Sequence, residues 1–131
     1  MKRIISLSAI VLALVFMSGC INYKAPIYNV PNSPIKPKLS ENEISKAIKL
    51  AGAPLGWEIT KIKDGELSGK LHLRSHIAII KITYDKNTYN ITYASSLHLK
   101  YNKEHQTIHS NYNGWIQNLQ NAIDRTLNAS K

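Results

Sequence analysis

The strongest constraint on the fold is an alternation of apolar and polar side chains, with a period of two, between residues 57 and 95. Successive side chains of a strand point to opposite faces, so this alternation predicts strands with one buried and one wet face. Asp64-Gly65 predicts a two-residue hairpin turn, because these residue types tolerate a positive φ. Arg74-Ser75 lacks glycine and is either a tight turn or a bulge in a continuous strand. The pattern predicts four antiparallel strands, at residues 57–63, 67–73, 77–84 and 88–95.

Apolar residues at helical spacing precede and follow the predicted strands. A capping box at residues 40–43 and the apolar stripe after it predict a helix over residues 41–51. Residues 96–109 are polar and are expected to be irregular. A second apolar stripe runs from Tyr112 to Leu127 and predicts a helix capped by Ser110 or Asn111.

These elements predict the fold class. It is α+β, a two-layer sandwich of a four-stranded antiparallel sheet with two helices on one face, in the order α-β-β-β-β-α. About 90 residues form one modest core and no more. Trp57 and Trp115 are both expected in that core.

The segment before the first helix is rich in proline. Residues 20–39 contain no glycine and four of the five prolines, Pro26, Pro31, Pro34 and Pro37. Proline biases its neighbours to extended geometry, so the segment is predicted to be a semi-extended tether that leads to a single small domain at residues 40–131. The alternative is that the apolar side chains of the segment pack onto the domain surface. These side chains are Tyr23, Ile27, Tyr28 and Val30.

Residues 1–19 have the layout of a secretory signal peptide, with a basic start, an apolar run and small residues at the exit. The apolar run is shorter than the roughly 20 residues that span a bilayer. Its end, Met17-Ser18-Gly19-Cys20, resembles the lipobox of bacterial lipoproteins. The resemblance implies that the Cys20 thiol receives a diacylglycerol, that the signal is cut before Cys20, and that the new amino group is acylated. The alternative is a free or dimer-forming thiol in a secreted protein.

The residue after Cys20 bears on the destination. In lipoproteins of enteric-type bacteria, an aspartate at this position commonly signals retention in the inner membrane, and this chain has Ile21 instead. The resemblance therefore implies a lipid-anchored protein of the cell envelope, in the outer membrane and facing the periplasm.

The net charge of the chain limits the classes of partner that it is expected to bind. The chain has 17 Lys and Arg against 8 Asp and Glu, for a formal net charge of +9. A nucleic-acid binder clusters its cations among exposed aromatic side chains. Here the basic residues are spread out and the tyrosines fall on the apolar side of strands, so nucleic acid is not expected as a partner. The positive charge suits an anionic envelope ligand, lipopolysaccharide or peptidoglycan. The single cysteine excludes an intramolecular disulfide and a Cys-based zinc site.

The histidines do not form a metal motif. His72 and His76 are four residues apart on strand-like sequence, with Arg74 between them. A zinc site needs a third ligand, and a neighbouring cation opposes a divalent metal. No metal and no cofactor are predicted.

The chain contains the residue types of a hydrolase triad, but they do not lie in a hydrolase motif. The triad would use Ser95 or Ser96 as nucleophile, His98 or His109 as base and Asp85 as the acid. Neither serine lies in the Gly-x-Ser-x-Gly turn that exposes a nucleophile in many hydrolases. No catalytic residue is therefore nominated.

Several polar residues lie at the ends of the predicted elements and are expected to converge where the last helix begins. They are Arg74, His76, Ser96, His109, Tyr112 and Asn113. One interpretation is a site for a small anion or glycan, because a helix N-terminus offers free N–H groups. The other is an internal hydrogen-bond network that joins the helix to the sheet.

Part of this pattern also resembles small proteobacterial lipoproteins of unknown function. They share an Arg-x-His strand and an Ile-His…Tyr-Asn-x-Trp helix start. The matching positions are Arg74, His76, Ile108, His109, Tyr112, Asn113 and Trp115. The resemblance covers residues 57–123 and implies a shared fold without adding an activity.

The sequence thus predicts a lipid-anchored envelope lipoprotein with a small periplasmic domain, acting as a non-catalytic accessory or binding module of an envelope assembly. Its expected partners are the membrane, through lipid at Cys20, and an envelope protein. The alternative function is binding of an anionic envelope ligand, and a third is a small periplasmic hydrolase.

Overall fold

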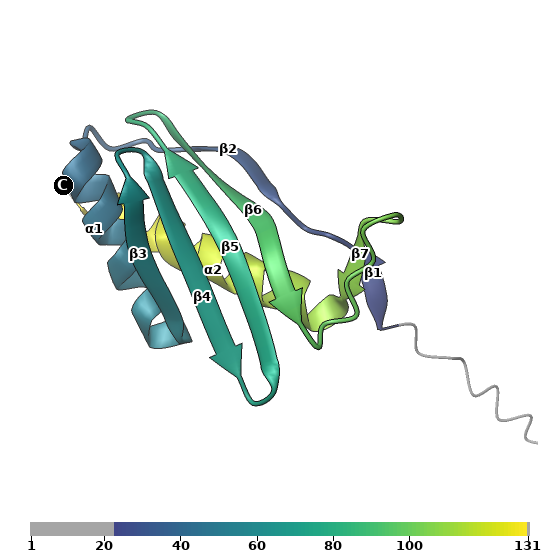
Figure 1. Cartoon of the computed structure of the whole chain (residues 1–131). Helices are drawn as coiled ribbons and strands as arrows, with labels where there is room; N and C mark the ends of the chain where they lie inside the picture. The colour runs from purple at the N-terminus through teal and green to yellow at the C-terminus, as the bar shows by residue number, and fades with distance from the viewer. Residues whose placement is uncertain (1–22, 131) are drawn as a thin grey trace, which may run out of the picture.

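The computed structural model describes residues 23–130, so the predicted signal peptide and Cys20 lie outside the described residues. The elements in chain order are β1 (Lys24–Pro26), β2 (Val30–Pro34), α1 (Glu41–Gly52), the short 3-10 helix η1 (Ala53–Leu55), β3 (Trp57–Lys63), β4 (Glu66–Leu73), β5 (His76–Tyr84), β6 (Thr88–Leu97), β7 (Thr107–His109) and α2 (Ser110–Ala129). Five strands form one sheet in the order β2-β6-β5-β4-β3, and β1 pairs with β7 separately. Both helices lie behind the sheet in Figure 1, so the fold is α+β with two layers.

The prediction of a four-stranded sheet is wrong, because β2 adds a fifth strand antiparallel to β6. This strand comes from the proline-rich segment that was expected to be a tether. Val30 and Ser33 of β2 are buried, so the strand contributes side chains to the interior. Pro31 and Pro34 are tolerated because β2 is an edge strand, where a missing N–H breaks no second ladder.

The segment around β2 also packs against the domain. Ile27 and Tyr28 are partly buried against the core, and Ile35 and Leu39 are fully part of it. Tyr28 Oη donates to Gln120 Oε1 of α2 at 2.6 Å. For residues 24–39, the structure therefore has the packed arrangement and not the tether.

Residues 96–109 are more regular than expected. They contain the end of β6 and all of β7, which pairs with β1. Arg74-Ser75 forms a two-residue turn between β4 and β5, and Arg74 has a φ of 56°. The two alternatives for this junction are thus resolved in favour of the tight turn.

The core lies between the sheet and the two helices. Ile44 and Ile48 of α1 and Ile116 of α2 are fully buried. Trp57 is only 3% exposed, whereas Trp115 is partly buried, so one of the two tryptophans lies less deep than expected. Gly69 of β4 leaves room for a neighbouring side chain within the sheet, because a Cβ there would lie 2.8 Å from the side chain of its cross-strand partner Ile80.

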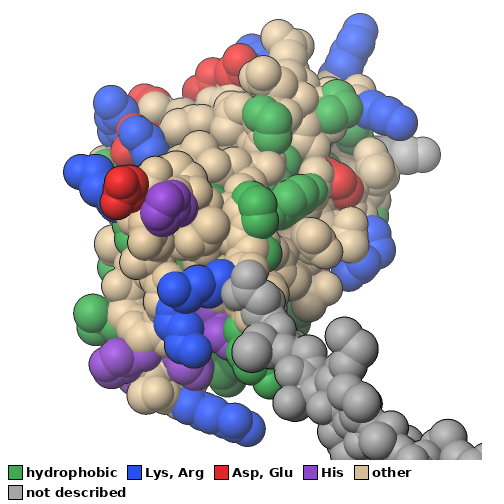
Figure 2. Space-filling model, turned by 90° about the vertical axis from the view of Figure 1, so that its right-hand side faces the viewer, with side chains coloured by type: hydrophobic (Ala, Val, Ile, Leu, Met, Phe, Trp, Pro, Cys, Tyr) green, Lys and Arg blue, Asp and Glu red, His purple; other side chains and the backbone are tan. Residues whose placement is uncertain are grey.

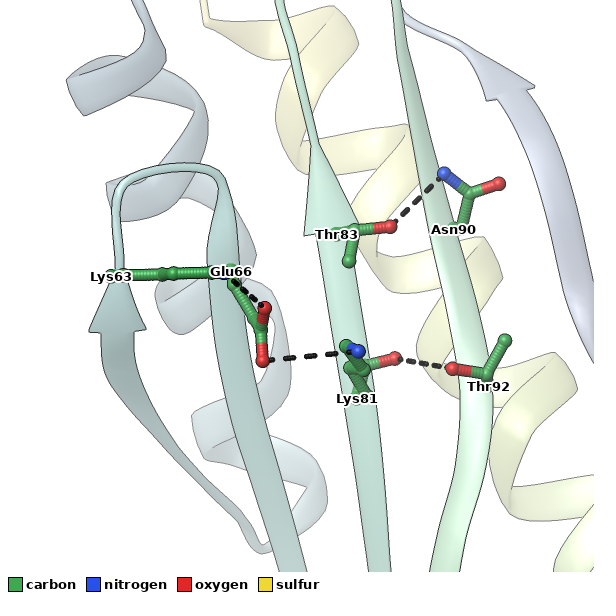
Figure 3. A network of polar contacts seen from close by, with 6 residues as sticks. All are labelled: Lys63, Glu66, Lys81, Thr83, Asn90 and Thr92. Carbon is green, nitrogen blue, oxygen red and sulfur yellow. Dashed lines mark hydrogen bonds and ion pairs between the residues drawn. The ribbon is translucent and has the colours of Figure 1, made fainter.

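The outer face of the sheet carries a cluster of polar side chains (Figure 3), and Ile62 is exposed on the same face, at 59%. Glu66 lies between two lysines, with Oε2 3.7 Å from Nζ of Lys63 and Oε1 4.0 Å from Nζ of Lys81. Next to it, Asn90 Nδ2 donates to Thr83 Oγ1 at 3.2 Å. Exposed pairs of this kind contribute about 0–1 kcal/mol each, so burial on the opposite face holds the sheet to the helices.

The predicted capping box begins α1. The backbone N–H of Glu43 donates to Ser40 Oγ at 3.2 Å, and the backbone N–H of Ser40 donates to Glu43 Oε2 at 2.7 Å. The hydrogen bond from the Ser40 N–H holds the pKa of the Glu43 carboxyl below its ordinary value. The ionised carboxylate thus stabilises the start of the helix.

This coupling predicts a pH effect on stability. A carboxyl with a lowered folded pKa stabilises the fold above its unfolded pKa, and that contribution is lost as the pH falls through the folded pKa. Because the folded pKa of Glu43 lies below 4.5, urea midpoints should fall with pH below that value. The fall should be smaller in Glu43→Gln. Glu41→Gln is the matched control, since Glu41 lies in the same first turn outside the capping box. Equal falls in wild type and Glu43→Gln would contradict the expectation.

Candidate functional site

The polar residues expected to converge do lie at one end of the domain, where α2 begins. We call it the α2 end, and it is formed by residues 23–24, 73–76, 97–101 and 107–113. Backbone hydrogen bonds join these segments. His109 N–H donates to Leu99 O at 2.8 Å, and Ser110 N–H donates to Tyr23 O at 2.6 Å.

Two histidines at this end form hydrogen bonds to the backbone of neighbouring loops. His76 Nδ1 lies 2.8 Å from the carbonyl oxygen of His98, and His98 Nδ1 lies 2.8 Å from the carbonyl oxygen of Ser75. A carbonyl oxygen only accepts, so both Nδ1 atoms donate. The two rings therefore tie the turn between β4 and β5 to the end of β6. The ring of His76 also lies 6.5 Å from the ring of Trp115 on α2.

Ser96 belongs to a cluster of tyrosines. Its Oγ lies 2.8 Å from Oη of Tyr93, whose ring stacks on Tyr101 at 4.3 Å and meets the edge of Tyr112 at 5.7 Å. Burial raises the pKa of Tyr93, and the hydrogen bond with Ser96 opposes that rise. Burial also raises the pKa of Tyr112 well above its ordinary range. Both hydroxyls therefore stay neutral and serve packing.

The start of α2 is capped from within the protein. His109 is the N-cap residue, and its Nδ1 accepts from the backbone N–H of Asn111 at 3.1 Å. The ring of Tyr23 stacks on the ring of His109 with centroids 5.5 Å apart. The cap is thus His109 and not Ser110 or Asn111. The first two N–H groups of the helix, on Ser110 and Asn111, are both used by the chain itself.

Asn113 holds the N-terminal segment against α2. Its Nδ2 donates to Pro26 O at 2.8 Å, and its Oδ1 accepts from the backbone N–H of Tyr28 at 2.9 Å. One side chain therefore satisfies a donor and an acceptor of the linker between β1 and β2.

These contacts decide what the arrangement can do chemically. Of the six predicted residues, His76, Ser96, His109 and Asn113 make hydrogen bonds within the domain, and Tyr112 is buried with no hydrogen-bond partner among the described residues. Arg74 is exposed on its turn. The geometry matches the internal network more closely than a ready anion pocket.

The hydrolase and metal combinations are not assembled by these contacts. Ser96 bonds to Tyr93, and the Nδ1 atoms of His98 and His109 bond to backbone groups. No hydrogen bond joins Ser95 or Ser96 to a histidine within residues 23–130. In the same part of the chain, no group of three or more His, Cys, Asp or Glu side chains is placed to hold a metal ion.

Several residues of the α2 end were not expected there from the sequence. Tyr23 and Lys24 come from the proline-rich segment. Lys100 lies after the end of β6 and has a φ of 53°. Lys24 lies opposite His109 in the β1–β7 ladder. Nothing local in the sequence signals this pairing, since the two residues are far apart along the chain.

Within the described residues, no helix combines the length and the apolar character needed to cross a membrane. Comparison with known proteins finds no matching family model, no matching curated protein and no matching solved structure.

Proposed function

We propose that the chain is a lipid-anchored lipoprotein of the cell envelope, whose small domain faces the periplasm and acts as a non-catalytic accessory or binding module of an envelope assembly. The observation that carries this proposal is the apolar run that ends in Met17-Ser18-Gly19-Cys20. A thiolate is a suitable nucleophile for lipid transfer, and two or three acyl chains anchor a protein stably.

The start of the folded part supports the proposal. Tyr23 is already hydrogen-bonded to Ser110, and β1 begins at Lys24. A cut before Cys20 therefore removes none of the described residues and breaks none of the described contacts. Processing and folding are compatible in this chain.

The described surface supports the binding part of the proposal. An apolar groove of about 600 Å³ lies between α1 and the end of α2, lined by residues that include Leu39, Ala47 and Leu50. Leu50 is among the exposed large apolar side chains of the domain. Exposed apolar surface of this kind is typical of sites that contact other proteins. The side chains of His76, His98, His109 and Ser96, by contrast, are engaged in contacts within the domain.

The test is the intact mass of the protein extracted from membranes of its native host. We expect a mass that matches residues 20–131 plus a diacylglyceryl group, with or without a further acyl chain. Cys20→Ser should lose the lipid mass and the membrane retention. Ser18→Ala is the matched control, because it keeps a small residue before Cys20 and should still be lipidated. An unlipidated wild-type chain cut at another position would overturn the anchor and, with it, the proposed function.

A further inference from the structure

The position of the proposed anchor fixes which part of the domain lies near the membrane. Three Cα–Cα steps separate Cys20 from Tyr23, and an extended chain covers at most about 11 Å in that distance. Tyr23 is bonded into the α2 end through Ser110 and His109. A lipid on Cys20 therefore keeps Tyr23 within about 11 Å of the bilayer surface, a distance comparable with the Debye length of about 8 Å at physiological salt.

The charge of the α2 end is mainly positive. Lys24, Arg74 and Lys100 are exposed there, and the segments that form it contain no Asp or Glu. The loop of residues 102–106, which joins two of these segments, adds one cation and one anion, Lys103 and Glu104. In Figure 2, the lower half of the face shown carries Lys, Arg and His side chains and no Asp or Glu, whereas the upper half carries side chains of both charges. This end is therefore complementary to a negatively charged surface.

Apolar side chains at the same end are exposed as well. Tyr23 is 50% exposed, Leu97 55% and Leu73 46%, and they are three of the six exposed large apolar side chains of the described chain. Tyrosine suits the boundary between headgroups and water, because its ring is apolar and its hydroxyl is polar. Cations and apolar side chains together are what a membrane interface accepts.

We infer that the α2 end is a docking face for an anionic phospholipid bilayer, the one that holds the lipid on Cys20. The inference rests on the proposed function, because it uses the anchor at Cys20. Lys24, Arg74 and Lys100 face the headgroup phosphates, and Tyr23 and Leu97 reach the interface. The polar outer face of the sheet and the groove beside α1 then remain available to partners in the periplasm.

The test places a thiol label at each end of β5. Ser75→Cys lies in the turn at the α2 end, and Asn87→Cys lies in the turn at the opposite end, both exposed. Lipidation of Cys20 leaves the new thiol as the one available for labelling. The full-length lipidated protein is reconstituted into vesicles of phosphatidylcholine alone, or with a third of the lipid as phosphatidylglycerol. A lipid-embedded quencher should quench the label at residue 75 several-fold more than at residue 87, and mainly in the phosphatidylglycerol vesicles.

Two of the three cations, Arg74 and Lys100, can be replaced without destabilising the fold. Arg74 and Lys100 have φ values of 56° and 53°, where glycine has no steric penalty. Arg74→Gly/Lys100→Gly should therefore melt at or above the wild-type temperature. Each cation near an anionic surface changes binding about fivefold, so the ratio of docked to undocked protein should fall by more than an order of magnitude. Lys46→Gln/Lys86→Gln removes the same charge elsewhere and should change little.

The outcomes separate this inference from the proposed function. The intact mass of the same sample shows whether Cys20 carries lipid. With lipid present, equal quenching at residues 75 and 87, or quenching that is indifferent to phosphatidylglycerol, overturns the docking face and leaves the lipoprotein assignment standing. Absence of the lipid overturns both.

Discussion

Trp57→Ala should lower the free energy of unfolding by about 3–5 kcal/mol, the largest loss expected from a single side chain of this domain. Trp57 is 3% exposed, and its ring lies beside Gly69 of β4 while its Cβ lies beside Gly52 of α1. A Cβ at Gly69 would lie 3.4 Å from the Trp57 ring. Removal of the ring therefore leaves a cavity that the neighbouring backbone cannot close.

The measurement is the urea midpoint of the full-length protein, followed by far-ultraviolet circular dichroism. Trp115→Ala is the control, because Trp115 is also a tryptophan beside β4 but is only partly buried. Its loss should be about 1–2 kcal/mol, since part of the ring is already in contact with water. Equal losses for the two variants would contradict the packing of the two rings. A small domain has about 5–15 kcal/mol in total, so the Trp57 variant should approach unfolding at physiological temperature.

The elements with a local signal could be predicted from the sequence almost to the residue. β3 occupies the predicted residues 57–63, and α1 exceeds its prediction by one residue. Both follow from short-range chemistry, an alternation of period two in the first case and a capping box in the second. α2 begins two residues before Tyr112, because His109 caps it through its ring. Histidine is a less common cap than serine or asparagine, so the capping preferences favour Ser110 or Asn111.

The strands without a local signal were the ones missed. β1 and β7 have three residues each, and β2 has two prolines in five residues. Their partners lie far along the chain, as in the pairing of Lys24 with His109. The residues of β2 form a strand because Val30 and Ser33 become buried, and this burial requires β6 as the neighbouring strand. A proline-rich sequence cannot distinguish an edge strand from a tether.

In the candidate site, too, some features follow from local sequence patterns and others depend on tertiary contacts. Alternation and capping patterns suffice to bring polar residues to the end where α2 begins. They do not show that His76 and His98 donate to backbone carbonyls of adjoining loops. They also do not show that Tyr23 and Lys24 return to this end, which places three exposed cations together. The charge of the α2 end is a product of tertiary pairing, and the dispersed basic residues of the sequence conceal it.

Asn113→Ala should lower the free energy of unfolding by about 2–3 kcal/mol and should release the N-terminal segment from α2. The substitution removes the partners of Pro26 O and of the Tyr28 N–H, and a partly buried backbone group without its partner costs about 1–3 kcal/mol. The effect is expected to be local first, because the core of β3, β4, β5 and β6 does not depend on these bonds.

Hydrogen exchange measured along the chain checks this. Amides of residues 24–34 should exchange faster in Asn113→Ala, while those of β5 keep their protection. Asn121→Ala is the control, since Asn121 is an exposed asparagine of the same helix. Unchanged exchange in residues 24–34 would show that Tyr28 and Val30 hold the segment without Asn113.

The consequence of release reaches the proposed membrane face. With residues 24–39 packed, the chain between Cys20 and the domain covers at most about 11 Å. With residues 24–34 released, the fifteen steps from Cys20 to Ile35 cover up to about 54 Å. The lipidated Asn113→Ala protein should therefore lose the contrast in quenching between labels at residues 75 and 87, although Arg74 and Lys100 remain in place. Asn113 on α2 should thus act together with the buried side chains of β2 to set how closely the lipid holds the domain.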